Sequence, residues 1–236
     1  MIRPLLAIGI GAGLCLPGSG VTRASHQPSP VSLALLYDST MPPVAADVRS
    51  DLRLKLVLDV VAQSLANQDI VRVGFVTGDV SWTRTFRAEE RPTLYSGVVS
   101  NISVAIADRL RNPALCDGLY GAVDVVAHDE ARRAVVAITA GRSGGNIHSF
   151  DELVAHAREA HVSLSAVHTP WPGIYSGKTS SEQYLTYWSH FPVSPHALLA
   201  RIATATGGTY IAPQPHVSGD LKRRLNKTLA AIRQTE

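Results

Sequence analysis

One segment of the chain has the residue spacing of a hydrolase nucleophile. Gly141-Arg142-Ser143-Gly144-Gly145 satisfies the Gly-x-Ser-x-Gly pattern and follows an apolar run typical of a buried strand. In a nucleophile elbow the serine lies on a strained turn that leads directly into a helix, and an acid and a histidine follow along the chain. The candidates for these two roles are Asp151 or Asp220 as the acid and His216 as the histidine. The two glycines after Ser143 make a poor helix start, so a serine hydrolase using Ser143 is an alternative rather than the leading interpretation.

The other sequence patterns of metal and nucleotide chemistry are missing. The nine histidines include no His-Glu-x-x-His, and no Cys-x-x-Cys accompanies them. The first apolar run ends in Asp38-Ser39-Thr40 rather than in a glycine-rich turn, and no phosphate-binding Gly-Lys-Ser or Gly-Lys-Thr loop occurs. We therefore expect no nucleotide cofactor and no zinc centre.

Apolar runs alternate with helical patterns along most of the chain. The predicted strands are Val31–Tyr37, Val71–Thr77, Ala134–Thr139, Val162–Val167 and Thr209–Ala212, with Ser81–Arg87 as an antiparallel edge strand. The predicted helices are Ala45–Ala66, Ser96–Leu110, Leu115–Ala127, Phe150–Ala160, Pro195–Thr206 and Val217–Arg233. Ser149 with Glu152 forms a capping box, and Gly207-Gly208 ends a helix. This order predicts an α/β fold: a doubly wound, mostly parallel, Rossmann-like sheet of about six strands with helices on both faces. Functional groups should gather at the carboxyl ends of its strands.

The first 24 residues have the composition of a signal peptide. Arg3 precedes an apolar run from Leu5 to Leu16, and small residues flank a cleavage position at Ala24. We expect a signal peptide at 1–24, a linker at 25–30 and one domain at 31–236, in a secreted or periplasmic protein with no membrane span after cleavage. Cleavage would lower the formal charge from +3 to +1 by removing two arginines, and no dense basic patch suggests nucleic acid. Only Cys116 would remain, which excludes an intrachain disulfide.

Five segments in order give the chain a resemblance to a known family. LALLYDST, PALCDGLYGAVDVV, RRAVVAITAGRSGG, FDELVAHAREAHVSLSAVHT and LLARIATATGGTYI resemble successive strands and helices of von Willebrand factor A (VWA) domains. The resemblance covers roughly Val31 to Arg233 and implies the same α/β fold. It also implies binding at the carboxyl edge of the sheet, where many members hold a divalent cation.

The cation ligands of that family are mostly missing here. The resemblance places ligands in three loops, and hard cations need several oxygen donors from such loops. Asp38 matches the first acid and Thr40 can replace the first serine, but Pro42, Pro113 and Ala140 stand at the other three positions. We therefore expect no resident Mg²⁺ or Ca²⁺, with Asp38 and Thr40 as the remnant of a degenerate site that caps the turn after the strand.

An aromatic-rich insertion is predicted at 170–195. It holds six of the fourteen aromatic residues: Trp171, Tyr175, Tyr184, Tyr187, Trp188 and Phe191. A connection this long inside a domain is usually functional or has structure of its own. Aromatic residues anchor interfaces, but the same residues can form a small core packed on the sheet, and their spacing leaves both interpretations open.

These observations favour a binding module over an enzyme. We expect a VWA-type domain that binds a protein partner without a metal, through the loops at the carboxyl edge; a structural domain of an envelope assembly is a further alternative. The candidate contact residues are Asp38, Ser39, Thr40, Arg142, Ser143, Trp171, Tyr175, Tyr187 and Trp188.

Overall fold

One mixed sheet organises the chain in the computed structural model, which describes residues 29–39, 52–76, 80–100, 114–141, 143, 146–169, 195–212 and 220–234. Its strands are β1 (Val31–Asp38), β2 (Ile70–Val76), β3 (Val80–Trp82), β4 (Phe86–Arg87), β5 (Arg132–Thr139), β6 (Ser163–His168) and β7 (Tyr210–Ile211). Their order is β3-β2-β1-β5-β6-β7, and β4 also pairs with β2. The pairings from β2 to β7 are parallel, whereas β3 and β4 run antiparallel to β2. The predicted mostly parallel α/β sheet is confirmed.

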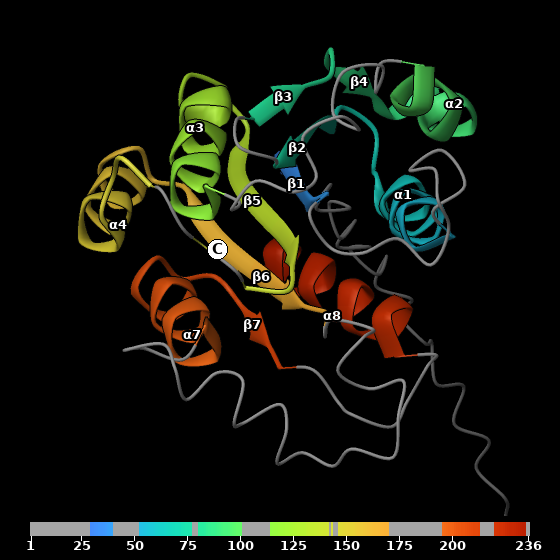
Figure 1. Ribbon diagram of the computed structural model, residues 1–236. Coiled ribbons are helices and arrows are strands. Elements are labelled where there is room, and N and C mark those ends of the chain that lie inside the picture. The colour runs from blue at the N-terminus through green and yellow to red at the C-terminus, as the bar shows by residue number, and fades with distance from the viewer. Residues whose placement is uncertain are drawn as a thin grey trace, which may run out of the picture.

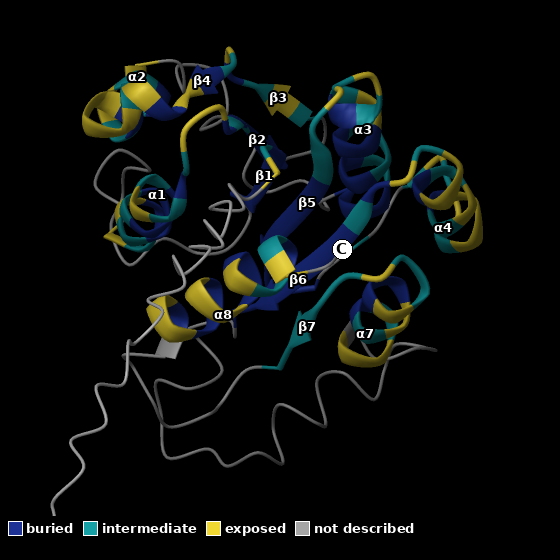
Figure 2. Ribbon diagram, turned by 180° about the vertical axis from the view of Figure 1, so that it is seen from behind, coloured by how far each residue is buried: buried dark blue, intermediate teal, exposed yellow. Residues whose placement is uncertain are grey.

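Helices cover both faces of this sheet (Figure 1). One face carries α1 (Leu52–Ser64), α2 (Leu94–Ser100) and α8 (Asp220–Gln234), with a 3-10 helix η2 (Ala88–Thr93) leading into α2. The other face carries α3 (Leu115–Ala127), α4 (Phe150–Glu159) and α7 (Pro195–Ala205). Figure 2 shows the central strands buried between these layers, the edge strands β3 and β7 less buried, and most exposed residues on the outer sides of the helices.

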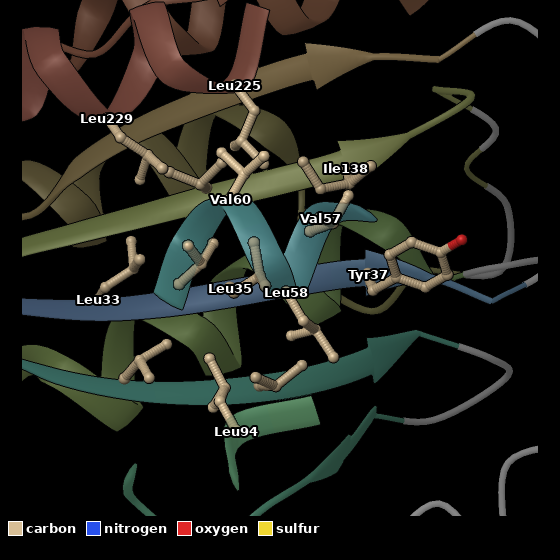
Figure 3. Close-up of a cluster of buried hydrophobic side chains, with 14 of the residues drawn as sticks. Leu33, Leu35, Tyr37, Val57, Leu58, Val60, Leu94, Ile138, Leu225 and Leu229 are labelled. Atoms are coloured by element: carbon tan, nitrogen blue, oxygen red, sulfur yellow. The ribbon is translucent and has the colours of Figure 1, made fainter. Parts of the chain in front are cut away.

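Strand β1 lies at the centre because both of its faces are apolar. All eight of its residues are buried. Leu33, Leu35 and Tyr37 point toward one helical layer, where they join Val57 and Leu58 of α1 (Figure 3). The alternate residues pack under α3 on the opposite face. Burying both faces in this way is what a parallel strand with an uninterrupted apolar sequence requires.

Local capping interactions fix the start of α4, near the carboxyl edge of the sheet, and the end of α7, near the amino edge. The Ser149 hydroxyl accepts from the amide of Glu152 at 3.2 Å, and the Glu152 carboxylate accepts from the Ser149 amide at 2.7 Å. This reciprocal capping box fixes where α4 begins, as predicted. After α7, Gly207 has φ of 73° and the Gly208 amide donates to the Ala203 carbonyl at 2.8 Å, which is a left-handed helix end.

Two predicted elements differ from the structure. Ser81–Arg87 forms β3 and β4 with a break between them, because the Thr83 hydroxyl takes the place of a backbone carbonyl and accepts from the Val73 amide at 3.1 Å. The helix expected at Ser96–Leu110 begins earlier: η2 starts at Ala88 and α2 follows at Leu94. Arg91, whose guanidinium donates to the carbonyls of Ala88 and Leu65, ties this earlier start to the body of the domain.

Candidate functional site

The carboxyl ends of β1, β5 and β6 meet around Asp38 and Thr139. The Asp38 side chain ends β1 and is only 1% exposed. Its Oδ2 accepts from the Thr139 hydroxyl of β5 at 2.8 Å, and the same hydroxyl oxygen accepts from the Gly141 amide at 2.8 Å. The Thr139 carbonyl in turn accepts from the Thr169 amide, beyond the end of β6. Hydrogen bonds thus hold three strand ends together.

Ser39 is turned inward beside Asp38. Its hydroxyl donates to the Val76 carbonyl at the end of β2 at 2.5 Å, and its amide donates to the same oxygen at 3.1 Å. Ser39 is 3% exposed. Asp38 and Ser39, predicted as contact residues, therefore have buried side chains. They hydrogen-bond to the ends of neighbouring strands and support the carboxyl edge from inside the protein.

A directional chain of hydrogen bonds crosses from β5 to β7 at the same edge. His168 Nε2 lies 3.1 Å from the Ala140 carbonyl oxygen, which can only accept, so Nε2 carries the proton. His168 Nδ1 then accepts from the Tyr210 hydroxyl at 3.0 Å, and that hydroxyl oxygen accepts from Nδ1 of His196 in the first turn of α7. Burial lowers the pKa of His168 to about 4, with smaller contributions from His196 and Arg224, although the hydrogen bond to Ala140 opposes the shift. The ring is therefore neutral at neutral pH.

Residues 146–148, in the loop after β5, are held by hydrogen bonds that involve the side chains of Asn146 and Asp117. Asn146 Oδ1 accepts from the Cys116 amide at 3.0 Å. Asp117, in the first turn of α3, accepts from the amides of Ile147 and His148 at 2.8 Å each and pairs with the His148 ring at 2.9 Å. Although partial burial opposes it, these bonds hold the pKa of Asp117 below its usual value. The backbone at Ile147 and His148 is consequently held in place, while Ile147 is 89% exposed.

A stack of three rings extends from this loop over the outside of α3. The Tyr120 ring lies between His148, at 3.9 Å between ring centroids, and His156 of α4, at 4.1 Å. His156 Nε2 also pairs with the Asp124 carboxylate at 2.7 Å. The stack links α3 and α4 on the surface and supports the loop that carries Ile147.

The geometry around Ser143 differs from that of a nucleophile elbow. Strand β5 ends at Thr139 and α4 begins only at Phe150, so the serine does not lead directly into a helix. Its hydroxyl donates to Asn146 Oδ1 at 3.1 Å and accepts from Asn146 Nδ2 at 2.9 Å. Asp151, one candidate acid, is paired with Arg201. Nothing in the described geometry favours the hydrolase alternative.

Several predicted site residues lie outside the described residues. They are the signal peptide at 1–24, the former ligand positions Pro42 and Pro113, the aromatic insertion from 170 to 194, the candidate base His216, and the contact residues Thr40, Arg142, Trp171, Tyr175, Tyr187 and Trp188. Of the other predicted contact residues, the structure brings Asp38 to Thr139 and Ser143 to Asn146. Ile147, Asp117 and Tyr120 were not predicted. Ile147 carries one weak sequence signal, an isolated apolar residue in a polar, glycine-rich loop.

The described residues contain neither a cluster of metal ligands nor a helix suited to a membrane. No group of three or more His, Cys, Asp or Glu side chains within them is placed to hold a metal ion. Across the same ranges, no helix combines the length and apolar character that spanning a membrane would need.

Comparison with solved structures identifies the fold. No family model and no curated protein matches the sequence. An aerotolerance-related membrane protein from Bacteroides fragilis superposes with a TM-score of 0.53 at 16% identity, over 86% of this chain and 98% of its own. BatB from Bacteroides thetaiotaomicron gives 0.52 at 14% identity, over 87% and 100%. A von Willebrand factor type A structure from Catenulispora acidiphila gives 0.53 at 14% identity, over 89% of this chain and 44% of its own. The chain therefore has the VWA-type fold that the sequence resemblance implied.

Proposed function

We propose that this chain is a secreted or periplasmic VWA-type module that binds a protein partner at the carboxyl edge of its sheet, without a metal ion and without enzymatic activity. The observation that carries the proposal is the buried hydrogen bond between Asp38 and Thr139. It engages the family's first acidic ligand inside the protein, and Ala140 offers no side-chain oxygen at the third-loop position. Two donors, Asp38 and Thr40, are too few for Mg²⁺ or Ca²⁺, which takes six or more oxygen ligands.

Residues 146–149, in the loop after β5, supply the contact surface in this proposal. Ile147 is the most exposed large apolar residue of the described chain, and Asp117 fixes the backbone on which it stands. An exposed apolar side chain on a hydrogen-bonded backbone binds at a lower cost in conformational entropy, because less backbone freedom remains to be lost. We infer that Ile147 enters an apolar socket on the partner.

Metal titration tests the metal-free part. Calorimetric titration of the full chain with Mg²⁺, Mn²⁺ and Ca²⁺ is expected to show no saturable binding. Asp38→Ala serves as the control variant. Micromolar affinity that disappears in Asp38→Ala would overturn this part of the proposal.

A photo-crosslinking amino acid placed at position 147 tests the contact surface. In the cells that produce the protein, position 147 should give a discrete adduct that survives chelation of divalent ions by EDTA. Asn67, exposed in the turn just before β2 at the opposite end of the sheet, is the control position away from this edge and should give none. Equal labelling at both positions would reject the carboxyl edge as the binding surface.

A fluorophosphonate probe tests the non-enzymatic part. We expect no labelling of the native chain, because Ser143 is hydrogen-bonded to an amide side chain rather than to a base. Labelling that is lost in Ser143→Ala would establish the hydrolase alternative instead.

A further inference from the structure

A basic cleft lies at the opposite end of the sheet, where β5 and β6 begin. It has a volume of about 370 Å³, within the range of about 300–1,000 Å³ usual for small-molecule sites. Its charged lining residues are Arg132 and Arg133 at the start of β5, Arg158 near the end of α4, and His161 in the following turn. No acidic residue is among the described residues that line it.

Each of the three guanidinium groups is held by the end of a different helix. Arg133 Nη1 donates to the Ala127 carbonyl of α3 at 2.5 Å, and Arg132 Nη1 donates to the Ile232 carbonyl of α8 at 2.8 Å. Arg158 Nε donates to the Ala205 carbonyl of α7 at 2.7 Å. Each arginine therefore has a fixed position but spends one of its five N–H groups on the described protein.

The three arginines carry more positive charge than the helix ends beside them can neutralise. A helix carboxyl end carries roughly half a negative charge, so three ends offset about half of the charge of three guanidiniums. Asp129 lies beside Arg133: burial opposes the lowering of the Asp129 pKa, which comes mainly from hydrogen bonds with Arg72 and Ser32 and least from Arg133. Arg72 already pairs with Asp129 through both of its oxygens, at 2.6 and 3.2 Å. The cleft thus keeps a net positive charge.

The turn after α4 gives the cleft a rigid wall. His161 has φ of 52°, and the Val162 amide donates to the Ala157 carbonyl at 2.8 Å, so this turn closes α4 with a left-handed residue. Ser163 then begins β6 in the cleft wall. Because strand, turn and helix ends define the lining, the three arginines are held around one cleft without needing a ligand to order them.

We propose that this cleft binds a phosphate-class oxyanion, either free phosphate or a phosphate monoester in solution, or the phosphodiester of a lipid headgroup. Planar guanidinium groups donate paired hydrogen bonds to such oxyanions, and their fixed orientation favours this geometry over a diffuse attraction. The site is separate from the carboxyl edge and does not depend on the function proposed for that edge.

Calorimetric titration of the full chain with inorganic phosphate at low ionic strength tests the free-anion source. Saturable binding is expected, and Arg158→Gln and Arg133→Gln should each weaken it about tenfold, as the loss of a paired guanidinium contact predicts. Arg84→Gln is the matched control, because Arg84 is an exposed arginine held by Glu90 outside the cleft, and it should leave phosphate affinity unchanged. Two cleft variants are used so that one failing to fold leaves the other as a test.

Co-sedimentation with vesicles distinguishes the lipid source. Vesicles of phosphatidylcholine with phosphatidylglycerol are compared with phosphatidylcholine alone, using the same variants. Binding to the anionic vesicles that requires Arg158 and Arg133, without binding of inorganic phosphate, assigns the site to a headgroup; the reverse result assigns it to a soluble phosphate. No saturable binding in either assay, or binding that the cleft variants and Arg84→Gln weaken equally, overturns the proposal.

Discussion

Acidification should destabilise the protein through one buried histidine. His168 has a pKa of about 4 in the folded chain, against 6.5 for an ordinary histidine, chiefly because it is buried. Between these two values the unfolded chain binds a proton that the folded chain does not, so stability rises with pH across this window and falls as pH drops. Stability conferred by the neutral ring is complete above pH 6.5 and is lost progressively toward pH 4.

The size of this effect follows from the shift. One pKa unit corresponds to about 1.4 kcal/mol. At about pH 5, which is roughly 1.5 units below the pKa of the unfolded histidine, the loss of unfolding free energy is about 2 kcal/mol. Carboxylates whose pKa is lowered in the fold, such as Asp117 and Asp129, lose their contribution mainly below this range. They therefore contribute little to the slope near pH 5.

Urea unfolding at a series of pH values measures the effect directly. The wild type should lose about 2 kcal/mol of unfolding free energy between about pH 8 and pH 5. His168→Gln, which keeps an N–H for the Ala140 carbonyl but does not titrate, should show a much flatter dependence whatever its absolute stability. If both proteins respond to pH with the same slope, His168 is not the group responsible and the assignment of its neutral state is refuted.

Other expected outcomes concern single positions. Gly208→Ala should cost about 3 kcal/mol or more, because an added Cβ would lie 2.0 Å from the Leu164 carbonyl oxygen. The control Gly121→Ala, inside α3 with nothing within 4 Å, should gain up to about 1 kcal/mol; thermal melts compare the two. Cys116, whose pKa burial raises to about 12, should resist iodoacetamide at neutral pH until urea unfolds the chain. Asp117→Ala removes the acceptor of two loop amides, and hydrogen exchange at those amides should accelerate while that of β5 stays slow.

Local patterns predicted the elements that depend on nearby residues. Helix α3 occupies the predicted range Leu115–Ala127, because its apolar residues repeat at helical spacing. The capping box at Ser149 set the start of α4 within one residue, since both partners of the box lie in the same turn. The end of α7 at Gly207-Gly208 could also be predicted, because a left-handed backbone conformation strongly favours glycine.

Contacts between residues far apart in the sequence could not be predicted from local patterns. The hydroxyl of Thr139 reaches Asp38 across 101 positions of the chain, and Asn146 reaches the Cys116 amide across 30. Neither pair has a spacing that local periodicity could reveal. The break between β3 and β4 arises in the same way, because the Thr83 side chain competes for a backbone partner on β2. The sequence therefore predicted the sheet well and the side-chain network at its edge poorly.

That network explains how the carboxyl edge can keep its shape in the proposed metal-free state. A buried carboxylate is costly unless hydrogen bonds stabilise its charge, and Asp38 receives one from Thr139, whose oxygen is itself polarised by the Gly141 amide. Hydrogen bonds in series strengthen one another, and the next residue, Ala140, is held by His168. The edge thus combines the buried, hydrogen-bonded carboxyl group of Asp38 at β1 with a neutral imidazole at β6. A proton taken up by His168 in the folded chain would disturb the β6 end of this network first, so the proposed binding at this edge should weaken only as the pH falls through about 4, the pKa of the folded ring.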